Sequence, residues 1–192
     1  MAKIKLLGGD ALTASDSLKA ASGLWRERHP GTFHGMFSKS SGDPATDYVS
    51  DFHRADYSGS REIADFSAMF SGCEFMVRAP LFDTGNGVDF RDMFSGCLKL
   101  KYVPAYDLSK AENLERIVDG CGELVEFACV NIGASLDLSS CRKMDAKALR
   151  AVIGNLVPAH GKGKVLRLGP TNIAKLRPDD ISLANEKGWT LC

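Results

Sequence analysis

The apolar positions of this chain recur every 24 residues. The pentapeptide MFSGC occupies residues 69–73 and again residues 93–97, and a third copy keeps Gly120 and Cys121 at the same spacing. Self-similarity at a fixed period of about 20–50 residues is typical of proteins built from stacked repeats. A single repeat of this length cannot bury its own apolar face, so we expect each copy to pack against its neighbours.

Each repeat is predicted to contain a short extended segment and a short helix. In the middle copy, residues 101–107 (KYVPAYD) are predicted to be extended. Pro104 cannot donate a main-chain hydrogen bond, so this segment is not expected to be an ordinary central strand. Helical spacing of i, i+3 and i+4 follows at the apolar residues Leu114, Ile117 and Val118. Gly120 stands where a helix commonly ends in a left-handed residue.

The extended segments share the pattern L-x-x-L-x-L, which is the strand signature of a leucine-rich repeat. Its apolar positions are Met76, Ala79 and Leu81 in the first copy, Leu100, Val103 and Ala105 in the second, and Leu124, Phe127 and Cys129 in the third. The predicted fold class is therefore α/β. It is a short leucine-rich-repeat solenoid with repeats of about 24 residues and divergent N- and C-terminal caps.

The chain is predicted to divide into two parts. Residues 1–35 form an N-terminal capping or attachment segment, with a helix from about Thr13 that either covers the end of the stack or docks on a partner. Residues 36–192 form the solenoid, with clear repeats at 69–92, 93–116 and 117–140 and a C-terminal cap at 141–192. A divergent repeat that starts at Met36 is expected to carry an insertion around residues 40–46.

Two helices and a strand are predicted in the C-terminal cap. One helix follows Asp145, a candidate N-cap, and its buried face consists of Leu149, Val152, Ile153 and Leu156. Residues 164–168 (KVLRL) alternate as a strand, and the second helix starts at Pro178. Trp189 is expected to fold back onto the stack.

Composition narrows the function classes. Lys and Arg together number 24, as do Asp and Glu, so the broad basic field of a generic nucleic-acid binder is not expected. No apolar run approaches the roughly 18 residues of a membrane-spanning helix. The apolar stretch near the start breaks at Gly8 and Gly9, too early for a signal peptide, so we do not expect export by an N-terminal leader.

No pattern predicts catalysis, a metal site or a cofactor, and we do not expect an enzyme. The segment HGKGK at 160–164 lacks P-loop spacing and precedes a predicted strand, so a solvated hairpin is expected there. The four histidines are scattered along the chain at His29, His34, His53 and His160. Cys141 lies beside Arg142, which favours a lowered thiol pKa, but no candidate base accompanies it. The basic residues of WRERHP at 25–30 are expected to be solvated at a helix terminus.

Two columns of the repeat are predicted to be structural. One, expected to be a ladder of buried and reduced thiols with disulfides or a metal as the alternative, consists of Cys73, Cys97 and Cys121. The other, whose side chains are expected to accept main-chain N–H groups in turns, consists of Asp83, Asp107 and Asn131.

A candidate recognition face lies on the outward side of the extended segments. One of its columns consists of Arg78, Tyr102 and Glu126, and the other of Phe82, Tyr106 and Val130. These columns vary in chemistry while their neighbours stay apolar, as expected of a recognition face. An unconstrained exposed column would vary in the same way.

The repeats resemble those of the BspA-like leucine-rich-repeat family. The resemblance rests on MFSGC followed by APLFDTGN or VPAYDLS, and on the closing segment TNIAKLRPDDISLANEKGWTLC, which is similar to the end of phage-encoded members. It extends from about Phe66 to Cys192. The resemblance implies a solenoid that binds partners without catalytic residues, in proteins that occur as bacterial surface adhesins, protist surface proteins and components of tailed phages.

The expected function is that of a non-enzymatic interaction protein. The resemblance implies a tail- or baseplate-associated virion component that assembles in the cytoplasm of a bacterial host and contacts other virion proteins or a host surface molecule. The alternative is a bacterial surface adhesin. Neither nucleic-acid binding, nor membrane insertion, nor a cofactor is expected, and assembly into an oligomer is open.

Overall fold

The computed structural model describes residues 29, 32–38, 57, 59–161 and 163–192. Three predicted features lie outside these residues: the helix from Thr13, the insertion at 40–46 and most of the segment 25–30. The described part of the predicted N-terminal segment is confined to residue 29 and residues 32–35.

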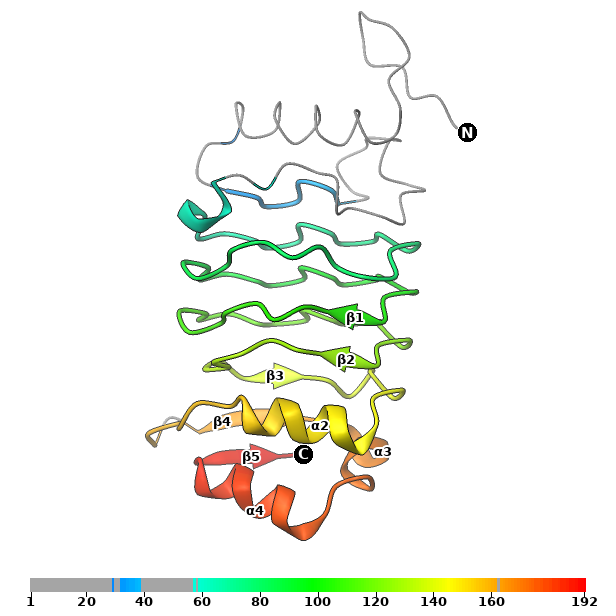
Figure 1. Cartoon of the computed structure of the whole chain (residues 1–192), viewed down its shortest axis with the longest axis vertical. Coiled ribbons are helices and arrows are strands. Elements are labelled where there is room, and N and C mark those ends of the chain that lie inside the picture. The colour runs from blue at the N-terminus through cyan, green and yellow to red at the C-terminus, as the bar shows by residue number, and fades with distance from the viewer. Residues whose placement is uncertain (1–28, 30–31, 39–56, 58, 162) are drawn as a thin grey trace, which may run out of the picture.

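Successive coils of the chain stack along the long axis of the molecule (Figure 1). We name the first coil 65–88, the second 89–112 and the third 113–135. Each coil has a turn leg, which starts at residue 65, 89 or 113, and a strand leg, which carries residue 78, 102 or 126. Parallel bridges join Asp65 to Asp89 and Asp89 to Asn113 along the turn legs.

The regular elements are short. They are the 3-10 helix η2 (Ser60–Glu62), the strands β1 (Tyr102–Val103), β2 (Glu126–Phe127), β3 (Leu136–Asp137), β4 (Lys164–Arg167) and β5 (Trp189–Leu191), and the helices α2 (Ala146–Gly154), α3 (Gly169–Ile173) and α4 (Pro178–Glu186). β1 and β2 form a two-stranded parallel sheet, and β3, β4 and β5 form a three-stranded parallel sheet in that order.

The predicted leucine-rich-repeat solenoid, with a strand and a helix in each repeat, is wrong. Within the described residues, the structure has few helices and only two short parallel sheets, and the α-helices all follow residue 145. The helix predicted at 114–118 is a run of turns, because residues 115–120 are in turn conformation.

The turns replace a helix because the main chain bonds between coils. The N–H groups of Phe90, Asp92 and Phe94 donate to carbonyls of the third coil at 2.9, 2.9 and 2.8 Å. The intervening N–H of Met93 donates to Phe90 three residues back, at 3.2 Å. An α-helix needs bonds from each N–H to the carbonyl four residues back, so this alternation excludes one. A left-handed residue in each turn leg, such as Asp92 with φ 56°, interrupts the helical path.

Glycine in the MFSGC motif is required by a left-handed backbone conformation. Gly72, Gly96 and Gly120 have φ of 76°, 75° and 75°. A Cβ on Gly96 would lie 3.6 Å from the Cα of Gly72 in the coil above, and its left-handed conformation already disfavours any other residue.

Stacked aromatic rings fill the core between the legs. The rings of Phe66 and Phe90 lie 5.2 Å apart, and those of Phe70 and Phe94 lie 5.5 Å apart and nearly parallel. The first two positions of the L-x-x-L-x-L pattern are buried in each copy, but the third is not consistent: Leu81 is 66% exposed. The pattern therefore identifies the core only in part.

The predicted elements of the C-terminal end are confirmed. α2 starts after Asp145, whose carboxylate accepts the N–H of Ala148 at 2.7 Å, and its predicted apolar face is buried. α4 starts at Pro178, and Trp189 is 2% exposed. The predicted hairpin at HGKGK is wrong, because β4, which starts there, pairs in parallel with both β3 and β5.

Candidate functional site

The column of Arg78, Tyr102 and Glu126 lies on consecutive strand legs. Arg78 forms a parallel bridge with Tyr102, and Tyr102 pairs with Glu126 in the register of β1 and β2. The Arg78 guanidinium carbon lies 4.1 Å from the centroid of the Tyr102 ring, which is the geometry of a cation–π contact. Arg78 and Glu126 are exposed and Tyr102 is half-buried. The structure therefore brings these three predicted residues together on the surface.

The second predicted column is buried at Tyr106 and half-buried at Phe82 and Val130. The rings of Phe82 and Tyr106 lie 5.0 Å apart, and Phe82 also packs on Phe66 at 5.6 Å. Tyr106 is 1% exposed, its hydroxyl donates to the carbonyl of Pro80, and burial raises the pKa of Tyr106 well above its ordinary value. Phe82 and Tyr106 are therefore core residues and do not belong to a recognition face. The sequence did not distinguish them from outward residues because their burial depends on contacts with other coils, such as those of Phe82 with Phe66 and of Tyr106 with Pro80.

The first two coils carry further exposed apolar groups and a second cation–aromatic pair. Val77, next to Arg78, is 38% exposed, and Leu98 is 53% exposed. The ammonium group of Lys99 lies 4.7 Å from the centroid of the Phe75 ring.

The turn column of Asp83, Asp107 and Asn131 fixes loops. The Asp107 carboxylate accepts the amide of Asn131 at 3.0 Å and the N–H of Ser109 at 3.0 Å. The Asn131 amide, more than the Ser109 groups, holds the pKa of Asp107 below its ordinary value. Asp83 accepts the N–H of Gly85 at 2.9 Å in the same way.

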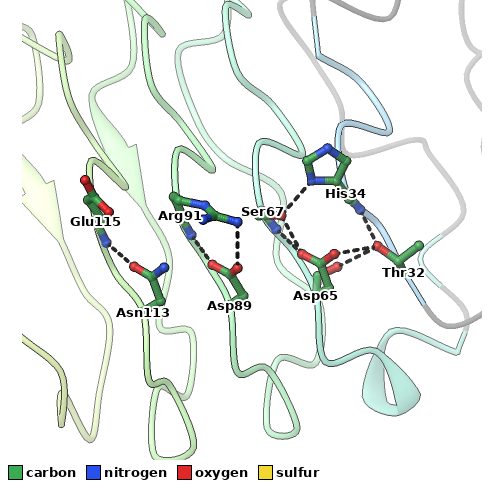
Figure 2. A network of polar contacts seen from close by, with 8 residues as sticks. All are labelled: Thr32, His34, Asp65, Ser67, Asp89, Arg91, Asn113 and Glu115. Carbon is green, nitrogen blue, oxygen red and sulfur yellow. Dashed lines mark hydrogen bonds and ion pairs between the residues drawn. The ribbon is translucent and has the colours of Figure 1, made fainter.

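A further ladder of polar side chains follows the turn legs and is absent from the sequence prediction (Figure 2). Asp65, Asp89 and Asn113 each accept the N–H of the residue two positions later, at 3.0, 2.9 and 2.9 Å. The signal is readable in ADFSAMF, VDFRDMF and ENLERIV, where Asp or Asn recurs every 24 residues four positions before the apolar pair. Such turns satisfy main-chain donors in each coil.

At the N-terminal end of this ladder, His34, Ser67 and Asp65 form a chain of hydrogen bonds. The Ser67 hydroxyl donates to Asp65 Oδ1 at 2.5 Å, so Nδ1 of His34, 2.6 Å from the hydroxyl, acts as the donor to it. A serine nucleophile needs the histidine between the serine and the carboxylate. Here the serine stands in the middle and is buried, so the cluster has a structural role.

The predicted thiol ladder forms. The thiols of Cys73, Cys97 and Cys121 donate to main-chain carbonyls of the preceding coil at 3.2, 3.1 and 3.1 Å, and no disulfide is present among the six cysteines. Burial raises the pKa of Cys121 to about 12 and that of Cys141 to about 12. The lowered pKa considered for Cys141 is therefore wrong. In the described ranges, no group of three His, Cys, Asp or Glu side chains could hold a metal ion.

Comparisons of the chain with protein-family models, with curated proteins and with solved structures find no match. Over the residues that the structure describes, no helix is both long and apolar enough to cross a membrane.

Proposed function

We propose that this chain is a non-enzymatic interaction protein that presents the column of Arg78, Tyr102 and Glu126 to a protein partner. The observation that carries the proposal is the stacking of these three side chains at the surface of adjoining strand legs, above residues that are almost fully buried.

The chemistry of the column suits recognition. Tyr and Arg are enriched among the residues that dominate protein interfaces. The Tyr102 ring holds Arg78 in place, so less conformational freedom is lost on binding than for a free arginine. The partner should offer an acceptor to Arg78, an apolar patch to Tyr102 and a cation to Glu126.

The biological setting proposed for this surface is a tailed-phage virion, in which the chain would be a tail- or baseplate-associated component that contacts host or virion proteins. Support comes from the MFSGC repeats and the closing KGWTL segment, which resemble phage-encoded BspA-like proteins. The same repeats favour the alternative, a bacterial surface adhesin.

Fractionation of the source culture distinguishes the two settings. Virus particles and cell envelopes are separated on a density gradient, and the chain is detected with an antibody. Detection in intact particles supports the virion proposal, whereas detection in envelopes alone supports the adhesin.

Binding through the column is tested with the double variant Arg78→Ala and Tyr102→Ala. It should lose partner binding while its melting temperature stays close to that of the wild-type chain, because Arg78 is exposed and Tyr102 is only half-buried. Lys147→Ala, at an exposed position of α2, is the matched control and should bind normally. Undiminished binding by the double variant contradicts the proposed face.

A further inference from the structure

The hydrogen-bond ladder between coils opens after the third coil. Parallel bridges run along the turn legs from Asp65 to Asp89 and from Asp89 to Asn113. The next step of the same 24-residue period would join Asn113 to Asp137. Both residues lie within the described range 59–161, and no bridge connects them.

Main-chain donors of the third coil are left without partners at this step. In the second coil, the N–H groups that donate to the third coil are those of Phe90, Asp92, Phe94 and Gly96. Their counterparts one period later are Leu114, Arg116, Val118 and Gly120. None of these four N–H groups has a hydrogen-bond acceptor among the described residues.

A cavity of about 450 Å³ lies where the ladder opens. Its walls include Leu114 and Arg116 of the third coil and Leu136 and Asp137 of β3. Leu114 and Leu136 are each only 2% exposed. Most of the other lining residues are polar or charged, among them Glu115.

We call this cavity the wedge; near Ser140, one of its lining residues, the chain still contacts the third coil. The thiol of Cys141 lies 4.0 Å from the carbonyl of Val118, whereas the equivalent contact of Cys121 with Phe94 is 3.1 Å. The Ser140 hydroxyl still donates to the carbonyl of Val118 at 3.4 Å. No bridge closes the cavity between Asn113 and Asp137.

The β3 wall also presents free main-chain groups. The N–H of Leu138 donates to the carbonyl of Arg167 in β4 at 2.7 Å. Main-chain groups of successive residues in a strand point to opposite sides, so those of the residue before Leu138 point away from β4. They belong to Asp137 and face the third coil. The wedge therefore has donors two residues apart on one wall and a strand edge on the other.

We infer that this wedge binds an extended peptide segment of a partner protein by strand addition. Carbonyl groups of alternate residues in an extended chain point the same way, which matches the N–H groups of Leu114 and Arg116. The volume falls in the range of about 300–1,000 Å³ that is usual for ligand sites. This site is on the turn leg, so it is separate from the proposed recognition column on the strand leg.

Charges on the two sides of the cavity indicate the kind of peptide. Lys164 and Arg167 belong to β4, on the β3 side, and Glu112 and Glu115 lie on the side of the third coil. Arg116 is already paired with Asp92 at 3.1 Å and with Asp119 at 3.6 Å. The peptide should therefore carry an acidic side chain toward β4 and a basic one toward the third coil.

Amide hydrogen exchange of the full chain, followed by NMR, tests the open ladder directly. The amides of Leu114 and Arg116 should exchange much faster than those of Phe90 and Asp92, their counterparts in the closed step. Equal protection of both pairs would show that the ladder is continuous and would overturn the inference.

Binding is tested with four pentapeptides of sequence Glu-Xaa-Thr-Xaa-Lys, acetylated and amidated at their ends. Both Xaa positions are Val, Tyr, Ser or Gly, and each peptide is used at about 1 mM, a concentration at which even weak ligands bind. At least one should shift the resonances of Leu114, Arg116 and Asp137 and slow the exchange of the first two amides. Failure of all four overturns the inference. The same shifts with inorganic phosphate in place of peptide would show an anion site instead and would also overturn it.

Charge reversal provides the specificity control. The double variant Lys164→Glu and Arg167→Glu should weaken binding of the peptide about fivefold and should bind the reversed peptide, Lys-Xaa-Thr-Xaa-Glu, with restored affinity. Lys147→Glu, exposed on α2 and outside the cavity, should leave the affinity unchanged. If the double variant binds each peptide with the same affinity as the wild type, the result contradicts the assigned site.

Discussion

The ammonium group of Lys187 lies at the C-terminal end of α2 and donates to the carbonyl of Gly154 at 2.6 Å. It also donates to Leu156 at 2.8 Å and to Ile153 at 3.1 Å, which uses all three of its hydrogens. The last carbonyls of a helix have no partner within the helix, and a cation there also meets the negative end of the helix dipole. The lysine of the closing KGWTL segment therefore joins the last strand of the chain to α2.

Replacement of Lys187 by Met should destabilise the fold by about 1–3 kcal/mol, because three carbonyls lose a charged donor while most of the aliphatic packing is kept. Burial lowers the pKa of Lys187, so part of the gain from these bonds offsets desolvation. Urea unfolding measures the change. Lys147→Met on the exposed face of the same helix is the control and should alter the free energy of unfolding by less than about 0.5 kcal/mol. Equal effects of the two changes would contradict the capping role.

Two variants of Trp189 should separate the packing contribution of its ring from the contribution of its hydrogen bond. Its indole is 2% exposed, and its N–H donates to the carbonyl of Val157 at 2.7 Å. Trp189→Ala should cost about 3–5 kcal/mol, and Trp189→Phe should recover part of that loss while it leaves the Val157 carbonyl unpaired. Thermal unfolding of both variants measures the difference. A melting temperature of the Ala variant within a degree or two of the wild type would show that Trp189 does not stabilise the end of the stack.

Local signals in the sequence predicted the C-terminal end well. Asp145 before an apolar helical face and Pro178 in a first turn act within a few residues, and both predictions are confirmed. The helix predicted at Leu114 is wrong because the carbonyls of this segment, those of Asn113, Glu115 and Ile117, accept N–H groups of the second coil, and no local period shows such bonds. The burial of Tyr106 depends in the same way on the neighbouring strand leg that supplies Pro80. The open step after Asn113 could not be predicted either, since the 24-residue period continues there in the sequence but not in the bridges.

The native chain should react with a thiol reagent at one cysteine. Cys192 is exposed, while the other five thiols are buried, and burial raises the pKa of Cys97 and Cys121 so that the reactive thiolate is scarce. Titration with a disulfide reagent at pH 8 should release one equivalent quickly, and all six after unfolding in guanidinium. Cys192→Ser should abolish the fast phase. A fast phase that persists in this variant would show that a ladder thiol is accessible.

Asp65 should make the fold sensitive to acid. Burial raises its pKa, but the hydroxyl and N–H of Ser67, the Thr32 hydroxyl and the charge of His34 together outweigh burial and lower it. The folded pKa is then below the unfolded value, so the stabilisation is complete above that value and is lost as the pH falls through the folded pKa. The free energy of unfolding should therefore decline more steeply below about pH 4 in the wild type than in Asp65→Asn, whose amide oxygen can still accept the Ser67 N–H.

The third coil provides the reciprocal test, because Asn113 occupies the same position of the ladder and accepts the N–H of Glu115. Asn113→Asp introduces a carboxylate with the same main-chain donor and should steepen the decline in acid. Chemical unfolding at several pH values between about 2.5 and 6 measures both slopes. Parallel curves for Asp65→Asn and the wild type would show that the ladder does not contribute to the acid sensitivity.

Ala68→Gly should stabilise the fold, although the same change usually destabilises a protein. Ala68 has φ 52°, and its N–H donates to Arg91 of the next coil at 2.8 Å, so stacking holds an alanine in the left-handed region. That conformation costs about 1–2 kcal/mol for a residue with a Cβ. Glycine removes this strain but adds roughly 0.5–1 kcal/mol of chain entropy to be lost on folding, which leaves a net gain of up to about 1.5 kcal/mol. Ala64→Gly is the matched control, because Ala64 lies four residues earlier and its φ is not positive. This change should lower the free energy of unfolding by about 0.5–1 kcal/mol. Opposite shifts of the two melting temperatures are the expected result. Equal losses of unfolding free energy at both positions would show that the turn at Ala68 is not strained. They would also show that the side chain of Ala68, and not the bonds between coils, holds the left-handed conformation.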